Sequence, residues 1–583
     1  MRMVSHSVFL FAKHVDGIFY YLEYELYYEY MKSIFEYLLP GGSVLAACIV
    51  PQVGSTGTLA VNAASITDTG HPNIVCVVCE DIGPWLRCFG DSVAVTPTID
   101  ALAAEGVRYT GLYGTVGVSA PSRAALITGM YPTHINANYM RTQGGQVARP
   151  PAVGGYDVVL PEGVKCYTEL LRAAGYYCTN NPKTDYQFLP PLTAWDECNR
   201  QAHWRNRPAG MPFFAIFNTL ASHEQKVWES AMDTLYVSPD EVVLPPYYPD
   251  DSIVRRDIAI MYSNIYRVDC FVRQIMDELK ESGEWDNTIL IFYSDNGGPL
   301  PRQKREITEV GTHIPFIIRY PDGQLAGSVD EGLHSIIDIP PTILSLAGIK
   351  PPSYMDGKAF AGRHAEPSRR YVFAARDRMD KCYDQQGAVR DIRYRYICNY
   401  TPNQPGYQPV GFRLKMLMMR RMLQLHEEGR LDVSQESWFV WPRPREEFYD
   451  LAKDPHEMCN LIDDPACRKE VERLRKIYRR WEKRYWQCRP LTELEMIRTM
   501  WPDGVQPLVA APRIVLKRGW VSLECTTSGV SYAYQINGRG RNGEKHWNLY
   551  VEPFAVRKGD KVTVQAFRVG YKKSETTNLL VEY

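Results

Sequence analysis

Residues 73–81 read NIVCVVCED, a nearly continuous apolar run that ends in two carboxylates. Residues 212–217 (PFFAIF) and 288–293 (TILIFY) have the same form and are also followed by polar residues. Continuous rather than alternating hydrophobicity predicts strands that are buried on both faces, as in a parallel sheet. Helical patterns at 168–174 and 263–279 lie between these strands, so the sequence predicts an α/β fold with a doubly wound sheet.

The polar residues after the predicted strands are candidates for a binding site. Glu80-Asp81 follows the first strand, His223 lies just beyond the second, and Asp295-Asn296 follows the third. Ligands bind outside the carboxyl ends of the strands in open α/β sheets, so we expect these side chains to meet. Their hard oxygen donors suit Ca²⁺ or Mg²⁺, although each pair alone is also typical of a helix cap or a solvated turn.

Length and composition limit the class of protein. A chain of 583 residues is too long for one compact core, so two or three domains are expected. The formal net charge is -1 and there is no basic block, which argues against a nucleic-acid partner. Cys76 and Cys79 have the spacing of a metal pair. Because residues three apart in a strand point to opposite faces, we expect two buried small hydrophobic residues instead.

The character of the sequence changes near residue 370. Short strand-like stretches, including 389–397, and a charged helix at 467–485 then indicate a smaller sheet with its own helix. From residue 509, alternating strands with turn signals predict a small all-β module. The predicted divisions are a leader (1–65), a catalytic α/β domain (66–370), a smaller α+β C-terminal subdomain (371–490), a linker (491–508) and a small β-sandwich module (509–583).

The N-terminal region carries export signals. Residues 1–30 are rich in Tyr and Phe and do not resemble a signal, whereas Met31 opens a better one. A positive start is followed by a broken apolar stretch at 38–50, in which Leu45-Ala-Ala-Cys48 resembles a lipobox. We expect export to the periplasm or the cell surface, with a lipid anchor at Cys48 as the membrane contact. The alternative is a leader without a targeting role.

Residues 119–129 read SAPSRAALITG, which resembles the signature of the type I sulfatase family: Cys or Ser, any residue, Pro, Ser, Arg, continuing to Thr-Gly. Further blocks resemble that family in the same order. They are TPTIDALAAEGV at 96–107, KREITEVGTHIP at 304–315 and EFYDLAKDPHEMCNL at 447–461. The resemblance covers roughly residues 72–485 and implies a sulfuric ester hydrolase with an alkaline-phosphatase-like α/β fold.

The resemblance also implies that Ser119 is oxidised to formylglycine by a maturase, of the anaerobic type because the residue is serine. A serine hydroxyl is a poor nucleophile, whereas a hydrated aldehyde offers two hydroxyls on one carbon. One hydroxyl attacks sulfur, and deprotonation of the other expels sulfate.

Site residues follow from the matched blocks. The implied Ca²⁺ ligands are Glu80, Asp81, Asp295, Asn296 and the modified Ser119. Arg123 and Lys183 match residues that anchor formylglycine, Lys304 matches a sulfate-binding lysine, and His223 matches the acid that protonates the leaving group.

Two positions depart from the family pattern. Glu80 stands where the family usually has aspartate, and its longer side chain should still reach the ion. Asp185 stands where the family has the histidine of Lys-x-His, so Asp185 is either the base of the release step or a substrate contact.

Three short segments are candidates for the substrate rim, because arginine forks suit the carboxylate or sulfate groups of a glycan. They contain Arg141, His203 with Arg205, and Arg376 with Arg378. Surface ion pairing is the alternative for each. The C-terminal module resembles the chitobiase/hexosaminidase C-terminal β-sandwich, which would bind carbohydrate or act as a spacer.

The sequence therefore predicts an exported bacterial sulfatase acting on sulfated glycans such as heparan-type or mucin-type chains, with a heparan N-sulfatase as one form of that activity. The alternatives are a phosphatase or phosphodiesterase on the same scaffold, and a non-catalytic glycan-binding protein in which Ser119 is never oxidised.

Overall fold

The computed structural model describes residues 71–143, 149–540, 543 and 546–582. The predicted leader, with Met31 and Cys48, therefore lies outside the described residues. Within the described part, no helix combines the length and the apolar character needed to cross a membrane.

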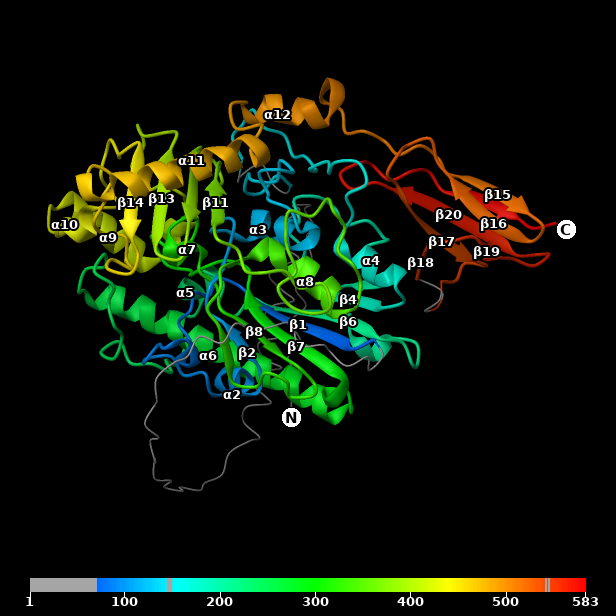
Figure 1. Cartoon of the computed structure of the whole chain (residues 1–583), viewed down its shortest axis with the longest axis horizontal. Coiled ribbons are helices and arrows are strands. Elements are labelled where there is room, and N and C mark those ends of the chain that lie inside the picture. Colours follow the sequence, from blue (N-terminus) through cyan, green and yellow to red (C-terminus); the bar gives the residue numbers. More distant parts are fainter. Residues whose placement is uncertain (1–70, 144–148, 541–542, 544–545, 583) are drawn as a thin grey trace, which may run out of the picture. The chain divides into compact units, whose positions relative to one another are not determined.

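The catalytic part is built on an eight-stranded sheet in the order β5-β4-β6-β1-β7-β8-β2-β9 (Figure 1). β1 lies at its centre, parallel to β6 on one side and to β7 on the other, as the continuous apolar runs predicted. β8 runs antiparallel to both of its neighbours. The strands are β1 (Asn73–Cys79), β2 (Val107–Tyr109), β4 (Tyr177–Asn181), β5 (Glu197–Cys198), β6 (Phe213–Thr219), β7 (Thr288–Ser294), β8 (Phe316–Arg319) and β9 (Ser328–Asp330).

Helices cover both faces of this sheet (Figure 1). The even-numbered residues of β1 pack with α3 (Ser119–Thr128), α4 (Tyr167–Ala173) and α8 (Ile339–Leu346). The odd-numbered apolar residues of β1 pack with α2 (Pro97–Glu105) and α6 (Ser252–Glu281). The two cysteines of β1 thus lie in different cores and are both buried, as expected for a strand.

The smaller subdomain is an antiparallel sheet in the order β11-β12-β13-β14, with α11 packed on it. The strand predicted at 389–397 is two strands, because the Asp391 carboxylate accepts hydrogen bonds from the backbone N–H groups of Arg393 (2.8 Å) and Tyr394 (2.7 Å) and closes a turn. The elements are β11 (Val372–Arg376), β12 (Gln386–Arg390), β13 (Tyr394–Asn399), β14 (Glu446–Asp450), α9 (Leu417–Glu427), α10 (Val433–Glu436) and α11 (Arg468–Tyr485).

The predicted linker 491–508 contains a helix, α12 (Glu493–Met500). A reciprocal capping box starts it: Thr492 caps the N–H of Glu495, and the Glu495 carboxylate accepts from the N–H of Thr492. The first residue of the helix, Glu493, is buried. The segment is therefore anchored by the ion pair of Glu493 with Arg378. Local composition does not reveal this contact.

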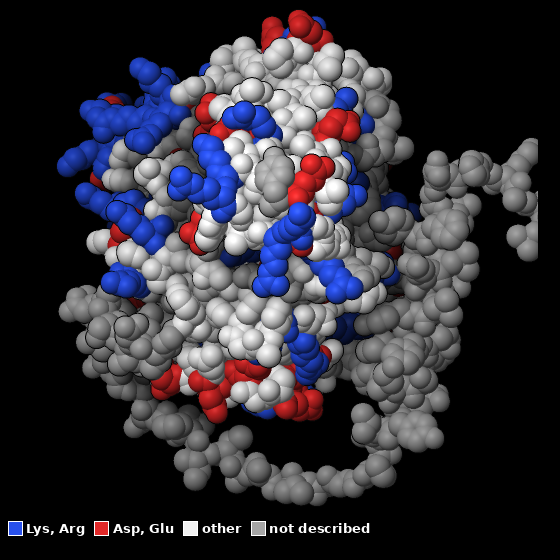
Figure 2. All heavy atoms as spheres, turned by 90° about the vertical axis from the view of Figure 1, so that its right-hand side faces the viewer, with Lys and Arg blue, Asp and Glu red and all other residues white. Residues whose placement is uncertain are grey.

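The C-terminal module is all-β, as predicted, with one sheet ordered β15-β16-β19 and another ordered β18-β17-β20-β21. Its strands are β15 (Arg513–Lys517), β16 (Trp520–Glu524), β17 (Ser531–Ile536), β18 (Asn548–Leu549), β19 (Phe554–Ala555), β20 (Lys561–Phe567) and β21 (Thr577–Leu580). Other short elements are β3 (Leu112–Tyr113), β10 (His334–Ser335), α5 (Gln225–Glu229) and α7 (Glu309–Thr312). On the face shown in Figure 2, Lys and Arg side chains gather at the upper left and Asp and Glu side chains along the lower rim, with both kinds in between.

Candidate active site

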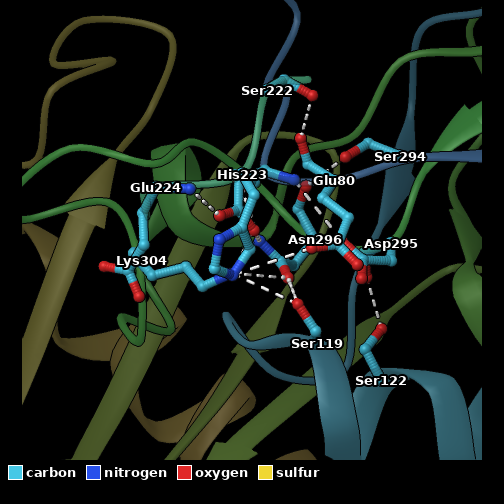
Figure 3. Close-up of polar contacts among 12 residues, drawn as sticks. Glu80, Ser119, Ser122, Ser222, His223, Glu224, Ser294, Asp295, Asn296 and Lys304 are labelled. Carbon is cyan, nitrogen blue, oxygen red and sulfur yellow. Dashed lines mark hydrogen bonds and ion pairs between the residues drawn. The ribbon is translucent and has the colours of Figure 1, made fainter. Parts of the chain in front are cut away.

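Ser119 is the first residue of α3 and is almost completely buried. Its hydroxyl lies 3.3 Å from the amide oxygen of Asn296 and 3.3 Å from the ammonium nitrogen of Lys304 (Figure 3). The start of a helix presents free N–H groups and the positive end of the helix dipole. Ser119 therefore occupies a position that favours negative charge.

The acidic pairs meet at one edge of the sheet because β1 and β7 are parallel neighbours with Cys79 opposite Ser294. The backbone N–H of Asp81 lies 3.4 Å from a carboxylate oxygen of Asp295, and the Asn296 amide donates to Asp81 at 2.9 Å. Asp81 has a left-handed backbone (φ 54°), a costly conformation for a residue other than glycine. The predicted convergence of these residues is thus present.

Three cations lie among these carboxylates. Arg123 donates to Asp295 at 2.9 Å and to Glu80 at 3.2 Å, and Lys183 forms an ion pair with the same Glu80 oxygen. Lys304 pairs with Asp81. Burial opposes the ionised form of Glu80, but the charges of Lys183, His223 and Arg123 lower its pKa well below the usual range. The cluster therefore holds Glu80 as a carboxylate.

His223 follows β6 and reaches the same cluster. Its Nδ1 accepts from the backbone N–H of Gln225 at 3.3 Å, which leaves Nε2 as the protonated ring nitrogen. Nε2 lies 3.7 Å from Glu80. Asp185 lies at the outer side, half-exposed, with its carboxylate 3.2 Å from the Lys183 ammonium. His223 thus lies among the acidic residues, as its place after the strand predicted, and Asp185 is linked to them through Lys183.

The donor set fits a hard divalent cation in its chemistry. Glu80, Asp81, Asp295 and Asn296 are all buried, and Oε2 of Glu80 is a buried oxygen with no hydrogen-bond partner. Within the described ranges, no three His, Cys, Asp or Glu side chains are arranged as a metal-ligand set. In this structure the carboxylates of Asp81, Glu80 and Asp295 are paired with the cations Lys304, Lys183 and Arg123 instead.

Comparison with known proteins identifies the family. The Sulfatase family model matches residues 72–191 and 192–349, and the model described as N-sulphoglucosamine sulphohydrolase, C-terminal matches residues 302–403. An ulvan-active sulfatase of Formosa agariphila is 40% identical over 545 residues, covering 87% of this chain and 91% of the relative. The chain belongs to the sulfatase family.

More distant relatives agree with this assignment. Human N-sulphoglucosamine sulphohydrolase is 25% identical over 473 residues, covering 73% of this sulfatase and 93% of the relative. The solved structure of a 2-O GAG sulfatase matches with a TM-score of 0.54 at 20% identity, covering 73% of this chain and 94% of that one. That likeness confirms the alkaline-phosphatase-like fold. The family model and the 40% identical relative show that the activity is that of a sulfuric ester hydrolase.

Other residues of the sulfatase site were not predicted. Glu224 donates its backbone N–H to Asp81 at 2.7 Å, and its carboxylate forms a buried bidentate pair with Arg305. Asn218 accepts from Arg123 at 2.8 Å. Glu224 and Arg305 adjoin His223 and Lys304 in sequence, but the contact that makes them important joins residues 81 positions apart. Serine hydroxyls also brace the backbone of the metal-ligand candidates (Figure 3): Ser122 donates to Asp295, Ser222 to Glu80 and Ser294 to Asn296.

Two of the three expected rim segments lie at the surface. Arg141 is partly exposed, forms an ion pair with Asp380 at 3.7 Å and lies above the ring of Phe412. His203 and Arg205 both pair with Glu278 of α6, which is the ion-pairing alternative.

Arg376 and Arg378 correct the prediction, because both are fully buried and cannot form an exposed rim. Arg376 pairs with Glu306 and Asp384, and Arg378 pairs with Glu493. A buried guanidinium needs such carboxylate partners, and here they come from distant segments.

Proposed function

We propose that this sulfatase hydrolyses sulfate esters, or sulfamates, of glycans through a formylglycine derived from Ser119 and a bound Ca²⁺. The buried hydroxyl of Ser119, within reach of Asn296 and Lys304, is the observation that carries the proposal. The names of the ulvan-active and N-sulphoglucosamine relatives support a sulfated carbohydrate as substrate.

The aldehyde and the ion would supply complementary chemistry. A hydrated aldehyde at residue 119 would supply the nucleophilic hydroxyl, and Ca²⁺ would polarise the sulfate and lower the pKa of that hydroxyl. Glu80, Asp81, Asp295 and Asn296 are the residues that would hold the ion. Arg123 holds Glu80 and Asp295 in place through its hydrogen bonds to both.

The remaining cations neutralise the substrate's charge. The ammonium of Lys304 lies 3.3 Å from the Ser119 hydroxyl oxygen, so it also contacts a sulfate placed for attack by residue 119. A buried, preorganised cation stabilises developing negative charge more strongly than an exposed one, because little water competes with it. Lys183 adds a second cation next to Glu80. The two lysines would therefore bind sulfate through their charge and fix its position beside residue 119.

Proton transfer is assigned to two residues. His223 directs Nε2 toward the cluster and, as the imidazolium, would donate the Nε2 proton to the leaving oxygen and become the neutral ring. Asp185, at the position of the family's histidine, would act as the base of the release step. Its half-exposed carboxylate beside Lys183 can accept a proton and pass it to water.

We further propose that the protein is exported to the periplasm or cell surface, with Cys48 as a lipid anchor, and that an anaerobic-type maturase oxidises Ser119. The lipobox-like sequence at 45–48 and serine at the signature position support these two points.

The test is sulfate release by the chain co-expressed with an anaerobic maturase. The substrates are ulvan oligosaccharides for the ester reaction and N-sulfoglucosamine for the sulfamate reaction. We expect inorganic sulfate from at least one of them, and a loss of about 10⁴-fold or more in Ser119→Ala, because the nucleophile is removed. Release of phosphate from 4-nitrophenyl phosphate without any sulfate release would favour the phosphatase alternative. Substrate binding without turnover would favour the binding protein.

A further inference from the structure

Beside His223 lies a cluster of side chains that the proposed reaction does not use. The ring of Phe412 lies 6.3 Å from the His223 ring and 4.9 Å from the Trp228 ring, which it meets edge to face. The cationic groups of Arg141 and Lys415 lie 5.4 Å and 5.2 Å from the centre of the same Phe412 ring. Arg141, Trp228, Phe412 and Lys415, here called the Phe412 cluster, are all partly or fully exposed.

The two cations of the Phe412 cluster keep hydrogen-bond donors for a ligand. The carboxylate nearest to Arg141 belongs to Asp380, 3.7 Å away, which is too long for a hydrogen bond. That Asp380 oxygen has no hydrogen-bond partner. Among the residues with described positions, no carboxylate forms an ion pair with Lys415. Arg141 therefore has one long ion pair, with Asp380, and Lys415 has none among the described residues, so both cations keep N–H groups for a ligand.

The chain holds Arg141 in a strained conformation. Arg141 has a left-handed backbone with φ 58°, which residues other than glycine rarely adopt. On one side, Met140 and Arg378 exchange hydrogen bonds of 2.9 Å: the Met140 N–H donates to the Arg378 carbonyl, and the Arg378 guanidinium donates to the Met140 carbonyl. On the other side, the N–H of Thr142 donates to the side chain of Gln187 at 3.1 Å. Strain held in this way is typical of ligand clamps.

Phe412 is fixed relative to the catalytic lysine. The next residue, Arg413, is buried and donates to the backbone carbonyl of Lys304 at 2.7 Å. The Arg413 guanidinium also lies above the Trp438 ring, 4.9 Å from its centre. The backbone that carries Phe412 is therefore tied to the backbone at Lys304 through Arg413.

We propose that the Phe412 cluster binds an acidic sugar ring adjacent to the sulfated one. The apolar face of that ring would pack on Phe412 and Trp228, and its carboxylate would lie between Arg141 and Lys415. This inference rests on the proposed function and narrows its substrate class to glycans whose sulfated residue is linked to a uronic acid.

The test measures binding to the chain expressed without a maturase, in which Ser119 stays a serine and substrate is not consumed. The probes are ulvan oligosaccharides, either native or with their uronic acid carboxylates reduced to alcohols, in titration calorimetry. We expect the wild-type chain to bind the native form about tenfold more tightly, the contribution of about one charge-assisted hydrogen bond. The double variant Arg141→Gln/Lys415→Gln should lose that difference, and the surface control Lys558→Gln should keep it.

Two further variants separate charge from stacking. Phe412→Leu keeps an apolar side chain and should weaken both forms of the oligosaccharide by the same factor, leaving their ratio unchanged. Lys415→Gln alone should reduce the preference for the native over the reduced oligosaccharide, and it leaves the strained backbone at Arg141 unchanged. The proposal is overturned if the wild-type chain binds both forms equally or does not bind the native form. It is also overturned if the double variant keeps the wild-type ratio of affinities for the native and reduced forms. Failure of the proposed function shows separately, as no sulfate release by the matured wild-type chain.

Discussion

Replacing Glu493 by glutamine tests whether α12 is docked through a buried charge. The Glu493 carboxylate accepts hydrogen bonds from Nε and Nη2 of Arg378, at 2.7 and 2.8 Å, and from the hydroxyls of Tyr156 (2.9 Å) and Tyr383 (2.7 Å). Arg378 in turn holds the backbone next to Arg141. An amide of the same size has one acceptor oxygen and no charge, so the buried guanidinium of Arg378 loses its counter-ion.

Breaking a buried ion pair by removing one partner costs about 3–5 kcal/mol. Because about 1.4 kcal/mol is a factor of ten, backbone amides of α12 and residues 376–384 should exchange hydrogen about 10²- to 4 × 10³-fold faster in Glu493→Gln than in the wild-type chain. Hydrogen–deuterium exchange read by mass spectrometry measures this locally. The matched control is Glu472→Gln on the exposed side of α11, with an expected effect below about 0.5 kcal/mol. Less than a tenfold acceleration in Glu493→Gln would refute the docking account.

Three other predictions concern the base, the metal and the pH dependence of stability. Asp185→Asn should lower kcat for sulfate release by about 10²–10⁴-fold, and a loss below tenfold would remove Asp185 from the role of base. EGTA should abolish sulfate release and added Ca²⁺ should restore it, while restoration by Zn²⁺ alone would contradict the oxygen-ligand assignment. Burial raises the pKa of Glu457 to about 7 from 4.5, so this carboxyl stabilises the fold while protonated and its contribution falls as pH rises from 4.5 to 7. Glu457→Gln should therefore flatten the pH dependence of thermal stability in that range by about 3 kcal/mol, and an unchanged slope would contradict the assignment.

The central sheet and the meeting of the acidic pairs could be predicted because both follow from local pattern. Apolar runs without alternation mark strands buried on both faces, and parallel neighbours bring their carboxyl ends together. The register of Cys79 with Ser294 then places Asp81 beside Asp295. The sulfatase family could also be predicted from the ordered motif blocks, and the relatives confirm it.

Contacts that depend on distant carboxylates could not be predicted. Arg376 and Arg378 have the composition of a surface segment, yet each is buried against acids from other elements, among them Glu493 of the predicted linker. A similar contact between distant segments joins two of the motif blocks. Glu457 accepts the N–H of Glu309 at 2.8 Å, so these two signature residues stabilise the loop after Lys304 rather than contacting the Ser119 cluster. The Ca²⁺, the formylglycine, the export signal and the domain boundaries stay predictions.

The most direct test of the formylglycine mechanism is the mass of the tryptic peptide 109–123 from protein co-expressed with an anaerobic maturase. This peptide ends at Arg123 and contains Ser119 and Ser122, which fragment ions distinguish. We expect residue 119 to lose a pair of hydrogen atoms, as serine becomes an aldehyde, and Ser122 to be unchanged. An unmodified Ser119, under conditions in which the same maturase converts a control sulfatase, would contradict that mechanism.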